Sequence, residues 1–163
     1  MVFLAMLAAF PSFAKEPAKA GNTAASPLTQ QVVRVPLAPK VSLDDAVQSM
    51  KIRANNLNMK LVGEMPLSKQ LQAMGEKSRR IEIFQFCDPL TAKKMVEANI
   101  EFAAYLPCRI TLVEDDQGKG WLVMMNLDPL INAANLNPEL RKDAIKVRDT
   151  LNEIIQAGAQ GEW

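Results

Sequence analysis

The pattern of apolar and polar positions along the chain predicts alternating strands and helices. Apolar residues alternate weakly over residues 31–35, and the run ends at Pro36, which predicts a short edge strand. Helical spacing begins at Ser42, where Ser42 and Asp45 resemble a capping box, and one apolar stripe then runs as far as Leu57. Four further strands are predicted over residues 60–65, 79–86, 108–114 and 120–127, the last two as a hairpin.

Two more helices are predicted between these strands. A short one covers residues 67–74, with apolar residues on one side. A second begins at Asp88-Pro89, because Asp88 can cap it and Pro89, at the first helical position, loses no useful hydrogen-bond donor. Residues 99–106 are predicted to form a loop or a frayed turn.

The longest predicted helix lies near the C-terminal end of the sequence. It begins at Asn137-Pro138, and Gly158 is its predicted stop. We expect its apolar stripe to pack on its own domain rather than on a partner, because isolated helices of this length are marginal in water. The whole order of elements predicts an α+β fold with a mainly antiparallel sheet and helices packed on one face.

The N-terminal segment predicts export from the cytoplasm. Residues 2–10 are almost wholly apolar, and Ser12 and Ala14 occupy the −3 and −1 positions of a signal-peptidase site. We therefore predict a signal peptide over residues 1–14, a flexible linker over residues 15–30, and a periplasmic location. Since no Lys or Arg precedes the apolar run, two alternatives stay open: an uncleaved segment that anchors the protein to a membrane, or a true start upstream.

Composition excludes several classes of function. The formal charge of +1 gives no concentrated basic patch, which argues against a nucleic-acid partner. Histidine is absent, which excludes His-based triads, His-ligated zinc and His-ligated haem. Two cysteines alone cannot complete a tetrahedral zinc site, and neither a Gly-rich phosphate loop nor a serine-nucleophile motif is present. We predict no cofactor, no metal and no catalytic residue.

The two cysteines are the main candidates for chemistry. Cys87 lies where a strand ends and a helix begins, so free N–H groups and the helix dipole predict a lowered thiol pKa. By strand alternation, Cys87 shares a face with Ile83, and Cys108 shares a face with Ile110. If both faces point to the core, the two thiols approach each other. Three interpretations stay open: a structural disulfide, a pair of buried thiols, or a functional pair that serves redox chemistry, a ligand or a metal.

Several short motifs carry a resemblance to a known family. They are Ser42-Leu43-Asp44-Asp45-Ala46, Cys87-Asp88-Pro89 with Ala92, Leu106-Pro107-Cys108, Glu114, Gly118 and Asp128-Pro129. With them, residues 31–130 resemble the bacterial domain-of-unknown-function family 302, which usually has Asn at the position of Asp88. The resemblance implies a curved antiparallel sheet of the TATA-binding-protein class with helices on one side, possible homodimers, and no known activity. Residues 131–163 would then form a C-terminal helical extension.

These observations lead to one functional hypothesis and two alternatives. The candidate site for ligand binding or redox chemistry comprises Cys87, Asp88, Pro89, Pro107, Cys108 and Glu114. The leading hypothesis is a periplasmic, non-catalytic binding or accessory protein that uses a cleft near the cysteines, or its sheet surface in a dimer. Its expected partner is a second copy of itself or another protein. The alternatives are a thiol-dependent redox or sulfur-handling protein and a membrane-anchored accessory subunit of a larger complex.

Overall fold

The computed structural model of the protein describes residues 30–163. The predicted signal peptide over residues 1–14 lies outside the described residues, and so does the predicted linker apart from Gln30. Within the described part of the chain, no helix has both the length and the apolar character needed to cross a bilayer.

The centre of the fold is an antiparallel sheet with the strand order β1-β5-β4-β3-β2. Its strands are β1 (Val32–Pro36), β2 (Lys60–Met65), β3 (Ile81–Cys87), β4 (Cys108–Glu114) and β5 (Gly120–Met125). β1 lies at one edge of the sheet. Pro36 is tolerated there, because proline has no N–H group to donate and an edge strand pairs on one side only. Phe84 and Phe86 of β3 are buried on one face, while Ile83, Gln85 and Cys87 are only half-buried on the other.

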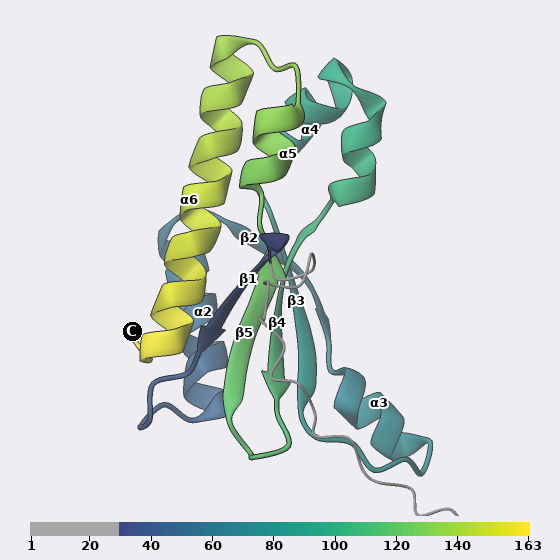
Figure 1. Ribbon diagram of the computed structural model, residues 1–163, viewed down its shortest axis with the longest axis vertical. Coiled ribbons are helices and arrows are strands. Elements are labelled where there is room, and N and C mark those ends of the chain that lie inside the picture. Colours follow the sequence, from purple (N-terminus) through teal and green to yellow (C-terminus); the bar gives the residue numbers. More distant parts are fainter. Residues whose placement is uncertain (1–29) are drawn as a thin grey trace, which may run out of the picture.

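Helices cover one face of this sheet and extend beyond one of its ends. They are α2 (Leu43–Asn56), α3 (Leu67–Ala73), α4 (Pro89–Ala98), the 3-10 helix η1 (Ile100–Tyr105), α5 (Asp128–Ala133) and α6 (Pro138–Gln160). Figure 1 shows α2 and α6 together beside the sheet, with α4 and α5 gathered at one end and α3 at the other. The predicted α+β architecture, with an antiparallel sheet and helices on one face, is confirmed.

The hydrophobic core lies between the sheet and the pair α2–α6. Met50 of α2, Ile154 of α6 and Phe86 of β3 are all fully buried there. α2 begins as the sequence predicts, because Ser42 and Asp45 form a reciprocal capping box. The long C-terminal helix thus packs on its own domain, and its burial in the main core stabilises it.

Local details correct two expectations. α6 ends at Gly161, whose left-handed φ of 70° favours glycine, and not at Gly158. Gly158 lies inside the helix instead, where a Cβ atom would come 2.5 Å from Cγ of Met50 and 2.9 Å from Cδ1 of Leu122. Its missing side chain therefore permits close approach of α6 to α2 and the sheet. Residues 100–105 form the 3-10 helix η1, which is more regular than the predicted loop or frayed turn, because the Asn99 side chain accepts a hydrogen bond from the Glu101 N–H.

α5 is a short helix that the hydrophobic pattern does not reveal. Pro129 stands in its first turn, and the Asn126 side chain accepts a hydrogen bond from the Asp128 N–H just before it. α5 leads from the end of β5 toward the start of α6 and carries one buried residue, Ile131. It thereby closes one side of the region above the sheet where the candidate site lies (Figure 1).

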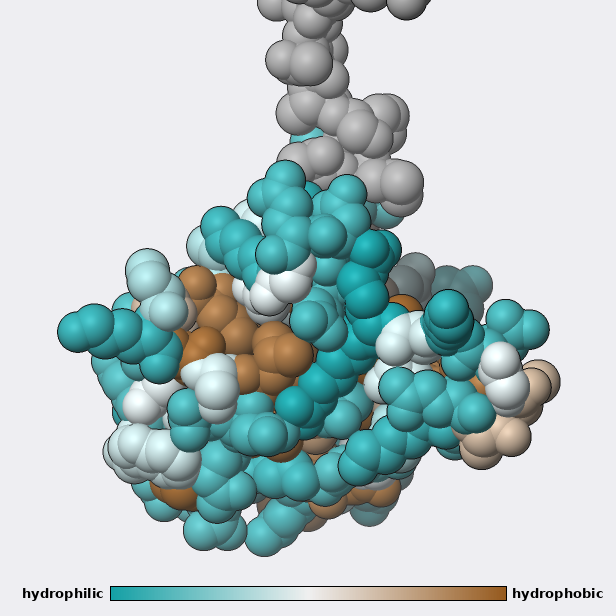
Figure 2. Space-filling model, turned by 90° about the horizontal axis from the view of Figure 1, so that it is seen from below, coloured by the Kyte–Doolittle hydropathy of each residue, from teal (hydrophilic) through white to brown (hydrophobic). Residues whose placement is uncertain are grey.

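Hydrophobic residues also reach the surface away from this region. Seen from the end opposite to α4 and α5, they form a patch surrounded by hydrophilic residues (Figure 2). Such patches are typical of contact surfaces when they are large. The expected self-association or protein partner stays a prediction.

Candidate functional site

The site begins where β3 passes directly into α4. Asp88 is the N-cap of α4: its carboxylate accepts hydrogen bonds from the Leu90 N–H at 3.1 Å, the Thr91 N–H at 3.3 Å and the Thr91 hydroxyl at 3.0 Å. Pro89 occupies the first turn, as predicted. Both carboxylate oxygens of Asp88 are thus used to fix the start of the helix, and the residue has a structural role.

A cavity of about 80 Å³ lies between this corner and the helices above the sheet. Its walls come from the ends of β3 and β4 and from α4, η1, α5 and α6. The lining residues are Met59, Phe86, Cys87, Asp88, Thr91, Ala92, Met95, Phe102, Tyr105, Leu106, Cys108, Leu127, Leu130, Ile131, Ala144 and Val147. The lining is almost wholly apolar, so the cavity is suited to an apolar occupant rather than to water.

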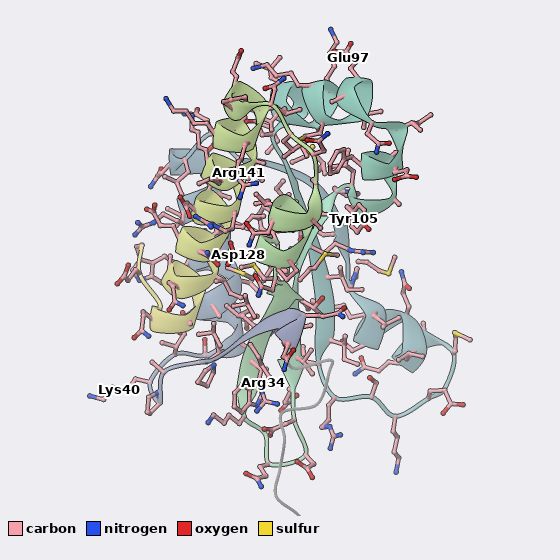
Figure 3. All side chains as sticks on the ribbon, turned by 45° about the horizontal axis from the view of Figure 1, so that its top comes forward. Arg34, Lys40, Glu97, Tyr105, Asp128 and Arg141 are labelled. Carbon is pink, nitrogen blue, oxygen red and sulfur yellow. The ribbon has the colours of Figure 1, made fainter. Side chains whose placement is uncertain are left out.

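One wall of the cavity, formed by α4 and η1 and here called the cap, is lightly packed. α4 contributes no buried residue, and Phe102 is the buried residue of η1. Leu90 and Ile100 of the cap are 76% and 78% exposed. Tyr105 lies at the end of η1 that faces α5 (Figure 3). A segment with so little buried surface opens more easily than a core helix.

Polar contacts between the cap and α6 lie at the surface. Lys94 of α4 donates to Asp143 of α6 at 2.8 Å and lies 3.6 Å from Glu139. Exposed ion pairs of this kind contribute about 0–1 kcal/mol. They orient the cap on α6 without holding it firmly in place.

Both cysteines line the cavity, but not for the predicted reason. Cys108 stands opposite Phe86 in the β3–β4 register and shares the core face with Ile110. Cys87 follows Phe86 and therefore leaves the sheet on the open face, together with Ile83. The condition that both faces point to the core is therefore not met. Cys87 still reaches the cavity because it is the last residue of β3, where the chain turns into α4.

Both thiols are free, and the pKa of each is raised above its ordinary value. Partial burial raises the pKa of Cys87, and the negative charge of Asp88 adds to the shift. Burial raises the pKa of Cys108 to about 11; a charged Cys87 contributes, and Arg109 opposes the shift. The predicted lowering at Cys87 is wrong, because desolvation and Asp88 outweigh the helix N-terminus.

Two other predicted residues do not line this cavity. Pro107 lines a neighbouring and wider depression on the open face of the sheet, which Cys108 also lines. Glu114 lies at the far end of β4, where its carboxylate accepts a hydrogen bond from the Arg80 N–H at 3.1 Å. The structure thus brings together Cys87, Asp88 and Cys108 and leaves Glu114 out of the cavity.

Sequence reasoning missed most of the cavity wall. Met95, Ala92 and Val147 lie on helical stripes that predict burial, but a stripe does not tell a packed core from the wall of a cavity. Phe102 and Tyr105 come from the segment taken for a loop. Over residues 30–163, no group of three or more His, Cys, Asp or Glu side chains is placed to hold a metal ion.

Comparison with known proteins places the chain in a family. The model of the family described as "Domain of unknown function DUF302" matches residues 34–158. The chain belongs to the DUF302 family. The match starts in β1 and runs through most of α6, further than residues 31–130 on which the resemblance was based.

A solved structure agrees with this assignment. The crystal structure of an uncharacterized conserved protein DUF302 from Bacillus stearothermophilus superposes with a TM-score of 0.65 at 16% identity, covering 77% of this chain and 96% of that one. At this identity the likeness shows that this DUF302 chain shares the fold. No curated protein matches the chain.

Proposed function

We propose that this DUF302 protein is a non-catalytic binding protein that holds a small, mostly apolar ligand in the cavity beneath the cap. The cavity itself is the observation that carries the proposal. The apolar walls around a space of about 80 Å³ lack partner atoms on one side. An apolar ligand that enters this space supplies these contacts, so binding should stabilise the fold.

The size of the cavity restricts the ligand. Pockets for drug-sized ligands measure roughly 300–1,000 Å³, so a cavity of about 80 Å³ admits only a few heavy atoms while the cap is closed. A larger ligand requires the cap to move. The absence of buried residues in α4 and its surface ion pairs at Lys94 support such a movement.

The chemistry of the cavity favours binding over catalysis. Raised pKa values keep Cys87 and Cys108 protonated near neutral pH, and a thiol is a poor nucleophile compared with a thiolate. The Asp88 carboxylate is occupied by the start of α4. A thiol-dependent redox function would need a lowered pKa at Cys87. Because this pKa is raised, the redox alternative is disfavoured.

Binding is tested with two apolar probes, xenon and benzene. We expect methyl NMR signals of Leu130 and Ile131 to shift on addition of xenon, which fits the closed cavity. The variant Ala92→Leu fills the cavity and should abolish the shifts. Ala98→Leu adds the same side chain to the same helix at an exposed position outside the cavity, and should preserve them.

Two outcomes would contradict the proposal: no methyl shift with either probe in the unsubstituted protein, or equal loss in both variants. A response to xenon but not to benzene would mean that the closed cavity binds and the cap does not open. A response to both supports a movable cap.

The proposal includes export to the periplasm. It is supported by the apolar residues 2–10 and by Ser12 and Ala14 at the −3 and −1 positions. Intact-mass analysis of protein isolated from the exported fraction tests it. Loss of residues 1–14 supports the secreted form, and retention of the segment in a membrane fraction would favour the anchored accessory subunit.

A further inference from the structure

The cavity collects sulfur atoms from distant parts of the chain. Four of its lining residues carry sulfur: Met59 before β2, Cys87 at the end of β3, Met95 on α4 and Cys108 at the start of β4. The sequence has two cysteines, and both line this one cavity. The flanks or ends of three strands and one helix of the cap thus contribute two cysteines and two methionines to the lining of one cavity.

This ligand set is selective for one class of metal ion. Thiolate and thioether sulfur are soft ligands that select Cu(I), whereas Mg²⁺ and Ca²⁺ require several oxygen ligands. The Asp88 carboxylate is the acidic group of the cavity wall, and its oxygens are held by Leu90 and Thr91. Among residues 30–163, no three His, Cys, Asp or Glu side chains gather as a zinc site requires, whereas Cu(I) also accepts the thioether sulfur of methionine.

We propose that the cavity binds one Cu(I) ion through the thiolates of Cys87 and Cys108, with the thioethers of Met59 and Met95 as additional ligands. This inference goes beyond the proposed binding of an apolar ligand and rests on the same cavity. Each thiol loses its proton to solvent as a Cu–S bond forms, so two protons leave, two bonds form, and the copper stays Cu(I) throughout.

The lightly packed cap provides a route for the ion, because Met95 lies on α4 and moves with it.

The test is anaerobic titration of the reduced, mature protein with Cu(I) in competition with the chromophoric chelator bicinchoninate. We expect uptake of about one Cu(I) per chain, with a thiolate-to-copper absorption band in the ultraviolet. Cys87→Ser and Cys108→Ser should each abolish the uptake. Met95→Leu should weaken it, whereas Met74→Leu, which changes a methionine of the surface that is 76% exposed, should leave it unchanged.

A second measurement uses the unsubstituted protein and does not depend on the folding of any variant. Bound Cu(I) should protect Cys87 and Cys108 from alkylation in the native state, as read by mass spectrometry. Absence of uptake, absence of protection, or equal weakening by Met74→Leu and Met95→Leu would overturn the copper site. Binding of xenon without uptake of Cu(I) rejects the copper site alone, and failure of both probes rejects the binding function as well.

Discussion

The two ends of α6 lie in regions that are built differently. Its C-terminal half packs with α2 against the sheet, where Met50, Ile154 and Ile155 are fully buried. Its N-terminal half faces the cap, where α4 buries no residue and a cavity is left beneath it (Figure 1). The comparison indicates that stability resides mainly in the α2–α6 layer, while the cap is free to accommodate a ligand. Four predictions test this division.

The largest effect is expected from a matched pair of methionines. Met50→Ala removes a fully buried side chain from the core layer and should lower the free energy of unfolding by about 2–5 kcal/mol. Met95→Ala makes the same change on half-buried α4 and should cost about 1 kcal/mol or less, because the site already borders a void. Urea unfolding measures both. Equal losses would show that the cap is as firmly packed as the core.

The second prediction uses the alkaline pH dependence of stability. Cys108 has a pKa of about 11 in the folded protein, against about 8.5 in an unfolded chain. Between these values the unfolded chain has lost the proton that the folded protein keeps, so a rise in pH favours unfolding. The free energy of unfolding should fall by about 2–3 kcal/mol over this range.

Cys108→Ala is the control for this experiment, because it lacks the titrating group while other alkaline groups remain. Urea unfolding between about pH 8 and 11 should show a steeper decline for the unsubstituted protein than for the variant. Parallel declines would mean that Cys108 titrates normally and that its end of the cavity is open to water.

The same two regions differ in how far the sequence predicts them. The elements of the core layer can be predicted because their sequence signals are local and repeated. The capping box at Ser42 marks the start of a helix, and the stripe that includes Met50 and the alternation around Phe84 indicate which faces are buried. Packing then follows, since each buried face has one sheet to pack against. The position of Gly158 inside α6 is the exception, because close approach of two elements is a tertiary property.

The cavity is less predictable, because it arises where elements fail to fill space. Cys87, Asp88 and Cys108 were found from local chemistry at strand ends, whereas Met59 and Phe102 carry no local signal for a shared wall. The raised pKa of Cys87 is hard to predict for a similar reason. The helix start and the adjacent Asp88 are visible in the sequence, but burial, the larger cause of the raised pKa, is not.

A buried serine gives a third prediction, within the core layer. Among the described residues, Ser49 Oγ is the buried side-chain polar atom without a hydrogen-bond partner. Since an unsatisfied buried hydroxyl costs about 1–3 kcal/mol, Ser49→Ala should stabilise the protein by about 1 kcal/mol. Ser68 is also buried but donates to the Ile81 carbonyl at 3.4 Å, so Ser68→Ala should not stabilise. A lower midpoint of urea unfolding for Ser49→Ala would mean that a partner, such as a bound water, satisfies the hydroxyl.

The smallest effect concerns the cap alone. Asp88→Ala removes the N-cap of α4 and should cost about 1 kcal/mol. Because α4 adds little to the core, we expect the loss to appear as faster amide exchange in α4 and η1, with exchange in α6 unchanged.

Asp88→Asn separates the two roles of this residue. An amide oxygen still accepts from the Leu90 and Thr91 N–H groups, so exchange in α4 should stay close to that of the unsubstituted protein. The negative charge that raises the pKa of Cys87 is gone, so this pKa should fall and alkylation of Cys87 at neutral pH should become faster. If Asp88→Asn instead accelerates exchange as much as Asp88→Ala, the carboxylate charge and not its hydrogen bonds holds the cap, and the interaction with the helix dipole is the stronger one.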